Sequence, residues 1–86
     1  MPVAFILMKT EPAHIDDVVK ALVDMEIVSE MHSLAGDYDL IVKVMVDDFD
    51  DLARLVVDRI QRLRHLRETK TLIAFDAYNV PKPRGK

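Results

Sequence analysis

The sequence predicts an α+β fold of the ferredoxin-like kind, in which a four-stranded antiparallel sheet carries both helices on one face. Three observations indicate this fold. Four segments are rich in apolar and β-branched residues, two further segments have apolar residues at helical spacing, and together they follow the order β-α-β-β-α-β. At 86 residues the chain holds a single small core. We expect one domain at residues 1–78 and a basic, proline-containing tail at 79–86.

The first strand is expected at residues 3–10, which are apolar on both alternating faces for most of their length. This pattern predicts a central strand. Pro12 suits the first turn of a helix, and we expect that helix to run from about Ala13 to Asp24. Its apolar residues recur at the spacing of one helix face and should form a single buried stripe; they are Ile15, Val18, Val19, Leu22 and Val23.

The second and third strands are expected at residues 28–34 and 40–46, and the third is rich in β-branched residues. Asp48 is a good N-cap for the second helix, whose apolar stripe continues to Leu63. Its carboxyl end is marked by cations that complement the helix dipole, namely Arg59, Arg62 and Arg64. Residues 67–78 complete the sheet as the fourth strand.

The face of the sheet away from the helices should carry apolar side chains, because the first strand is apolar on both faces and the third strand has Ile41 and Met45 opposite its buried set. An apolar surface of this size usually marks an interface. We therefore predict homodimerisation through the sheet, which gives a dimeric α+β barrel.

Composition excludes several classes of protein. No apolar stretch is long enough to cross a membrane and no signal peptide is recognisable, so a cytoplasmic protein is expected. Cysteine is absent, and the formal charge of -3 argues against direct nucleic-acid binding. His14, His32 and His65 are scattered, so no metal site is expected. No catalytic motif and no cofactor-binding motif is present, and we expect no enzyme activity and no cofactor.

The most informative segment is the turn Gly36-Asp37-Tyr38-Asp39 between the second and third strands. Gly36 permits a positive φ, the two carboxylates can cap the turn or present charge outward, and the tyrosine offers a flat apolar body with a polar tip. On local chemistry alone, an ordinary hairpin turn is the favoured interpretation.

In its setting, between Ser33 and the apolar run from Leu40 to Val44, this turn resembles the Gly-Asp-Tyr-Asp-aliphatic signature of the effector-binding domain of Lrp/AsnC transcription regulators. The resemblance extends from about Val3 to Tyr78. It implies that an amino acid or similar small effector binds between dimers, which assemble into a ring, an octamer being expected. The ligand-binding residues would be Met31, Ser33, Gly36, Asp37, Tyr38, Asp39, Thr69 and Thr71.

The chain departs from that family because its first predicted strand begins at residue 3, so we expect no helix-turn-helix domain of its own. The predicted function is amino-acid sensing by an oligomeric regulatory domain, which acts alone or by co-assembly with full-length Lrp/AsnC regulators. Two alternatives stay open: a small dimeric α+β barrel enzyme of the monooxygenase or isomerase kind, and a purely structural assembly module.

Overall fold

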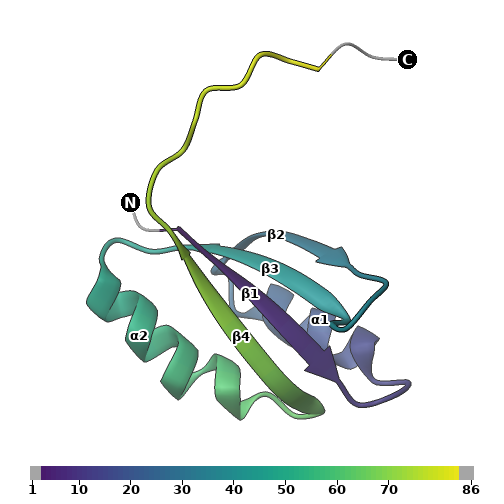
Figure 1. Ribbon diagram of the computed structural model, residues 1–86. Helices are drawn as coiled ribbons and strands as arrows, with labels where there is room; N and C mark the ends of the chain where they lie inside the picture. The colour runs from purple at the N-terminus through teal and green to yellow at the C-terminus, as the bar shows by residue number, and fades with distance from the viewer. Residues whose placement is uncertain (1–2, 84–86) are drawn as a thin grey trace.

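The computed structural model describes residues 3–83 and has the predicted order of elements (Figure 1). Its strands are β1 (Val3–Thr10), β2 (Val28–Ser33), β3 (Leu40–Met45) and β4 (Leu66–Ala74). Its helices are α1 (Ile15–Asp24), α2 (Phe49–Asp58) and a short 3-10 helix η1 (Ile60–Arg62). The strands form one antiparallel sheet in the order β2-β3-β1-β4. The ferredoxin-like prediction is confirmed, and β1 is a central strand.

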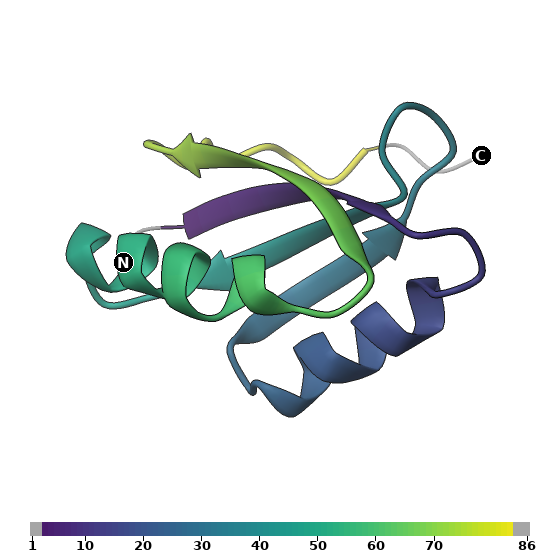
Figure 2. The ribbon, with the colours of Figure 1, turned by 90° about the horizontal axis from the view of Figure 1, so that it is seen from below.

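Both helices cover one face of the sheet and leave the other open (Figure 2). Alternate residues of β1 and β3 point to the helices, and in both strands they are almost completely buried. This face meets the apolar stripes of α1 and α2, because side chains alternate along a strand and recur every three to four residues along a helix. Val23, which was predicted to belong to the buried stripe of α1, is instead 57% exposed. The shared core consists of Ala4, Ile6, Met8, Val18, Leu22, Leu40, Val42, Val44, Leu52, Leu55, Val56 and Ile60.

The open face of the sheet mixes apolar and charged side chains. Residues directly opposite each other in an antiparallel pair project to the same side, so the register assigns each residue to a face. Phe5 lies between Lys43 on β3 and Leu72 on β4, and Leu7 lies between Ile41 and Lys70. We call this surface the open face; it comprises Val3, Phe5, Leu7, Lys9, Glu30, His32, Ile41, Lys43, Met45, Glu68, Lys70, Leu72 and Ala74.

The first helix begins two residues later than predicted. Ala13 has a positive φ of 67° and so cannot start a right-handed helix. The backbone instead makes a turn in which the N–H of His14 donates to the carbonyl of Glu11, at 3.1 Å. Pro12 therefore lies in this turn and not in the first turn of α1.

The second helix begins as predicted but ends earlier. The carboxylate of Asp48 accepts a hydrogen bond from the N–H of Asp51, at 2.9 Å, which confirms the N-cap. The α-helix ends at Asp58, and η1 replaces the expected last turn up to Leu63. This tighter turn places Ile60 in the core with no exposed surface.

The fourth strand ends at Ala74 and not at Tyr78. Ala74 lies opposite Val3, where β1 begins, so the following residues have run past their partner strand. Residues 75–83 extend away from the domain as an irregular segment (Figure 1). Within residues 3–83, none of the helices has the length and apolar character needed to cross a membrane.

Candidate functional site

The loop between β2 and β3 is fixed to the end of β1 by Asp39. The N–H of Asp39 donates to the carbonyl of Met8 at 2.8 Å, and its carbonyl accepts from the N–H of Leu34 at 2.9 Å. Its carboxylate Oδ2 accepts from the N–H of Thr10 at 2.9 Å and lies 3.5 Å from the Thr10 hydroxyl. Thr10 is buried, and hydrogen bonds that a carboxylate accepts from such groups are among the stronger ones in proteins. Asp39 is therefore a structural anchor.

Gly36 sets the backbone conformation of the same loop. Its φ is +152°, a region that residues with a side chain rarely adopt, while a Cβ at this position would have open space around it. The glycine is thus required by backbone geometry and not by a close approach of another group. Figure 2 shows that the loop bends towards the side of the sheet opposite the helices.

Tyr38 connects this loop to the first and last strands. Its hydroxyl donates to Glu68 Oε2 on β4 at 3.2 Å, and Lys9 Nζ on β1 lies 5.4 Å from the centre of its ring. Partial burial raises the pKa of the Tyr38 hydroxyl, and the hydrogen bond to Glu68 and the charges of Glu68 and Asp37 raise it further. The hydroxyl is therefore protonated at neutral pH and acts as a donor.

Asp37 differs from its neighbours because it is exposed. Over residues 3–83, its carboxylate makes neither a hydrogen bond nor an ion pair with another side chain. The loop therefore holds one aspartate in a fixed bonding role and presents the other to solvent. A carboxylate in this position is free to accept hydrogen bonds from a ligand.

The four other predicted ligand-binding residues lie on the helix side of the sheet. Thr69 and Thr71 are opposite Met8 and Ile6, whose side chains face the helices. Met31 and Ser33 are likewise on this side, opposite Val42 and Leu40 of the core face, and Met31 packs against the core. Within one chain these four residues and the loop do not form a single cluster. Their role in binding stays a prediction.

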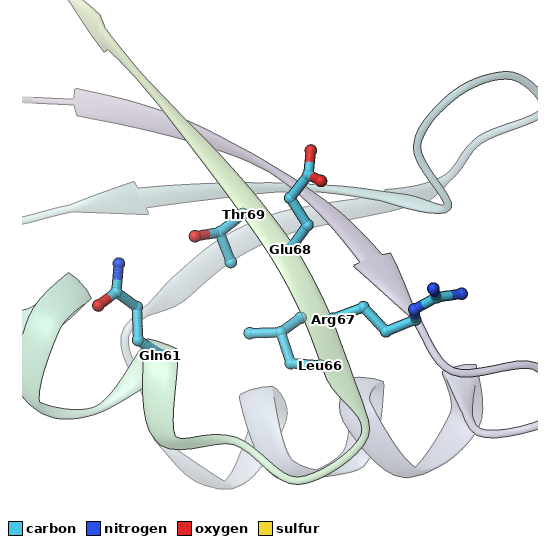
Figure 3. A pocket seen from close by; sticks show the side chains of 5 residues that line it. All are labelled: Gln61, Leu66, Arg67, Glu68 and Thr69. Atoms are coloured by element: carbon cyan, nitrogen blue, oxygen red, sulfur yellow. The ribbon is translucent and has the colours of Figure 1, made fainter.

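A cavity of about 270 Å³ lies where β4 begins, beside η1. Figure 3 shows Leu66 and Thr69 projecting to the side of β4 on which Gln61 lies, whereas Arg67 projects the opposite way and Glu68 points away from the helices. The register explains this divergence. Glu68 is opposite Lys9 and Leu66 is opposite Thr10, so Arg67 is the extra residue of a β-bulge. Bulges redirect side chains in this manner.

Arg67 also lines a second hollow, of about 410 Å³, together with Asp39 and residues of the β1–α1 loop. The sequence interpretation placed Arg67 at the start of the fourth strand and did not single out Gln61 or Glu68. The sequence did contain one signal for these residues, which is the adjacent pair of opposite charges, Arg67 and Glu68, directly before Thr69. A local sequence pattern does not reveal the bulge that separates them.

Two of the three histidines lie together, contrary to the expectation that all three are scattered. The rings of His14 and His65 stack in parallel, with centres 3.8 Å apart and planes inclined by 5°. His14 Nδ1 lies 2.9 Å from Asp17 Oδ2, and His65 Nδ1 lies 3.0 Å from Glu11 Oε1. These hydrogen bonds, and the nearby imidazoles, lower the pKa of both carboxyl groups.

The family model of the Lrp/AsnC ligand binding domain matches residues 3–83. The chain belongs to the Lrp/AsnC family. An uncharacterized HTH-type transcriptional regulator of Pyrococcus abyssi is 30% identical over 76 residues, which are 85% of this chain and 51% of that protein. The chain thus spans about half the length of the curated relatives it matches.

Several solved structures share the fold. The crystal structure of FFRP-DM1 is 37% identical and superposes with a TM-score of 0.84, over 87% of this chain and 100% of that one. A transcriptional regulator of Neisseria meningitidis, solved as a complex with L-Met, has a TM-score of 0.84 over 92% of this chain and 53% of that one. Its 15% identity shows a common fold only.

Proposed function

We propose that this chain senses an amino acid, or a closely related small zwitterion, and transmits binding through its state of assembly. The match to the ligand binding domain of the Lrp/AsnC family supports a regulatory, effector-binding role. The complex of the Neisseria meningitidis regulator with L-Met supports the class of effector. The observation that carries the proposal is the β2–β3 loop, because Asp39 fixes its position while Asp37 remains exposed on it.

A zwitterion matches the chemistry of this loop. Its ammonium group requires a carboxylate acceptor, which Asp37 supplies, because the carboxylate of Asp39 already accepts from Thr10. The carboxylate of the effector requires donors. The hydroxyls of Thr69 and Thr71 and the backbone N–H groups of the loop can supply them.

The arrangement of these groups supports a site between subunits. The loop lies on the side of the open face, whereas Thr69 and Thr71 belong to the helix side of an edge strand. Because the loop and the two threonines lie on opposite sides of the sheet, one small ligand contacts both most directly when the loop belongs to one chain and the threonines to another. A ligand that binds only the assembled protein shifts the oligomer equilibrium by mass action, which gives the domain a way to signal.

The open face supports the assembly itself. Phe5, Leu7 and Ile41 are only half-buried at its centre, and Leu72 and Met45 are 43% and 41% exposed. A sheet that is covered on one face and exposes apolar side chains at the centre of the other usually buries that centre against a partner. We propose that two copies pair through this face and that the dimers assemble further into a ring.

The direct test is a thermal-shift screen against the proteinogenic amino acids, with light scattering to follow the oligomer mass. We expect a few amino acids to stabilise the wild type and to change its mass, and Asp37→Ala to lose both responses. Asp47→Ala is the matched control, because Asp47 is also exposed in a loop after a strand but is outside the proposed site. Unchanged responses in Asp37→Ala would contradict the role of the loop.

Co-assembly with full-length regulators is a further part of the proposal. The matching regulators are about twice as long as the matched region, so their ligand-binding parts can present the same surfaces as this chain. We expect co-expression with an Lrp/AsnC regulator from the same cell to give mixed oligomers, detected by native mass spectrometry. Exclusive homo-oligomers would argue for independent sensing.

A further inference from the structure

Two loops that are far apart in the sequence meet at one end of the sheet. One loop joins β1 to α1 and contains Glu11, and the other joins η1 to β4 and contains His65. The N–H of Glu11 donates to the carbonyl of His65 at 2.8 Å, which holds the loops together. This contact places the ring of His65 on that of His14, with centres 3.8 Å apart.

The hydrogen bonds identify the donor atom of each ring, because a carboxylate can only accept. The carboxyl groups of Glu11 and Asp17 are exposed and, like ordinary carboxyl groups, ionised at neutral pH, so they can only accept. His65 Nδ1 and His14 Nδ1 must therefore donate to them, across 3.0 Å and 2.9 Å. For His14 this leaves the lone pair of the neutral ring on Nε2, whereas an ion shared by His65 and Glu11 takes the place of the proton on His65 Nδ1. Asp17, whose carboxylate orients His14 in this way, corresponds to the usual outer partner of a metal-binding histidine.

We propose that Glu11, His14 and His65 form a binding site for a divalent transition-metal ion, with Asp17 as the outer partner that orients His14. One possible ligand atom from each of the three residues lies within 4.8 Å of the other two. An ion such as Zn²⁺ binds imidazole nitrogen at about 2.0–2.1 Å, so the atoms must move closer together. The parallel rings turn towards each other to do so, which their partial exposure allows.

The surroundings select the class of ion. The cluster combines two imidazoles with the carboxylates of Glu11 and Asp17, so its possible ligand atoms are both nitrogen and oxygen. Ca²⁺ and Mg²⁺ need several oxygen ligands and a strongly acidic site. Two imidazoles and one carboxylate instead suit Zn²⁺, Ni²⁺ or Cu²⁺. Three protein ligands leave a coordination position for water or for an external ligand.

The two loops that carry the rings also contain residues in the left-handed backbone conformation. His65 has a φ of 68°, and Ala13, next to His14, has a φ of 67°. Residues other than glycine adopt this left-handed conformation at a cost, and such strain persists where the surroundings enforce it. Here it occurs on both loops that bring the rings together.

The test is a titration of the untagged full chain with Zn²⁺ alone, without amino acids, by isothermal titration calorimetry. We expect one ion per chain in the wild type. His14→Ala and His65→Gly remove a ligand each, and glycine retains the positive φ of residue 65. Asp17→Ala should weaken binding about tenfold, as loss of an outer partner does, and the two ligand variants should weaken it more. His32→Ala is the control, since His32 lies on the open face.

Co²⁺ provides an independent measurement, because nitrogen ligation gives it a distinct visible absorption spectrum. We expect this spectrum in the wild type and in His32→Ala and expect it to be absent in His14→Ala and His65→Gly. Circular dichroism of each variant checks folding, and His14→Ala tests the site even if His65→Gly fails to fold. Equal affinity in all variants, equal loss in His32→Ala, or no binding by the wild type would each overturn the proposal.

Discussion

At the residue scale, two aspartates of the same loop have different environments. Asp39 is bonded through its N–H, its carbonyl and its carboxylate, whereas Asp37 is exposed two positions earlier. The sequence gives both residues the same chemical character and predicts both as ligand-binding. Only the position of Thr10 next to Asp39 distinguishes the anchor from the free carboxylate.

This difference predicts unequal effects on stability. Asp39→Ala removes the acceptor of the buried Thr10 N–H and should lower the free energy of unfolding by about 1–3 kcal/mol. Asp37→Ala should change it by less than about 0.5 kcal/mol, as expected for an exposed residue without partners. Urea denaturation of both variants measures the difference. Equal destabilisation would show that the carboxylate of Asp39 does not anchor the loop.

The ionisation of Tyr38 is also decided by its neighbours. Since burial, Glu68 and Asp37 raise its pKa, the folded state holds the hydroxyl proton more tightly than the unfolded state. The contribution of this proton to stability is present below the ordinary tyrosine pKa and is lost as the pH rises through the higher folded value. We expect Glu68→Gln to lower the pKa of Tyr38.

Near-ultraviolet absorbance titration measures this pKa. A Tyr78→Phe background leaves Tyr38 as the only tyrosine, so the titration reports one group. The Tyr78→Phe variant is compared with the double variant Tyr78→Phe, Glu68→Gln. The difference between their titration curves isolates the effect of the Glu68 charge on the pKa of Tyr38. An unchanged titration curve would show that Glu68 does not contribute to the shift.

At the scale of single elements, the two helices begin in different ways. Asp48 caps α2 through its side chain, whereas His14 at the start of α1 makes no capping hydrogen bond with its side chain. The ring of His14 instead contacts Asp17 and His65. The start of α2 is therefore encoded locally, but the start of α1 depends on the turn that ends in the positive φ of Ala13.

The cap of α2 gives a local prediction. Asp48→Ala leaves the N–H of Asp51 without its acceptor and should lower the free energy of unfolding by about 1 kcal/mol. Asp47→Ala, one residue earlier, should have little effect. Thermal unfolding of both variants tests this prediction, which fails if the two variants are equally stable.

At the scale of the whole molecule, the helices cover one face of the sheet and leave the other open (Figure 2). The open face has an apolar centre around Phe5, with lysines and acidic residues around it. This composition matches an interface with a buried apolar centre and a polar rim. The domain is also small, so burial of this face would add to a limited core.

The proposed pairing predicts that a charge at the centre of the open face prevents assembly. Phe5→Lys should give a monomer in light scattering, because a lysine ammonium cannot be buried in an apolar interface without a partner. The helix-side core is not touched, so circular dichroism should retain the wild-type form. Val23→Lys, which charges an exposed apolar site on α1, is the control and should assemble normally. A monomeric wild type would contradict the pairing.

The sequence by itself determined the fold, the central position of β1, the cap of α2 and the loop that holds Asp37. These features depend on periodicity, caps and turn residues within short windows, where neighbouring positions carry the information. Tertiary structure decided which side of the sheet carries Thr69 and Thr71, that a bulge redirects Arg67, and where β4 ends. It also brought His65 to Glu11, 54 positions away in the chain. Strand register and loop closure set these contacts, and no local pattern encodes them.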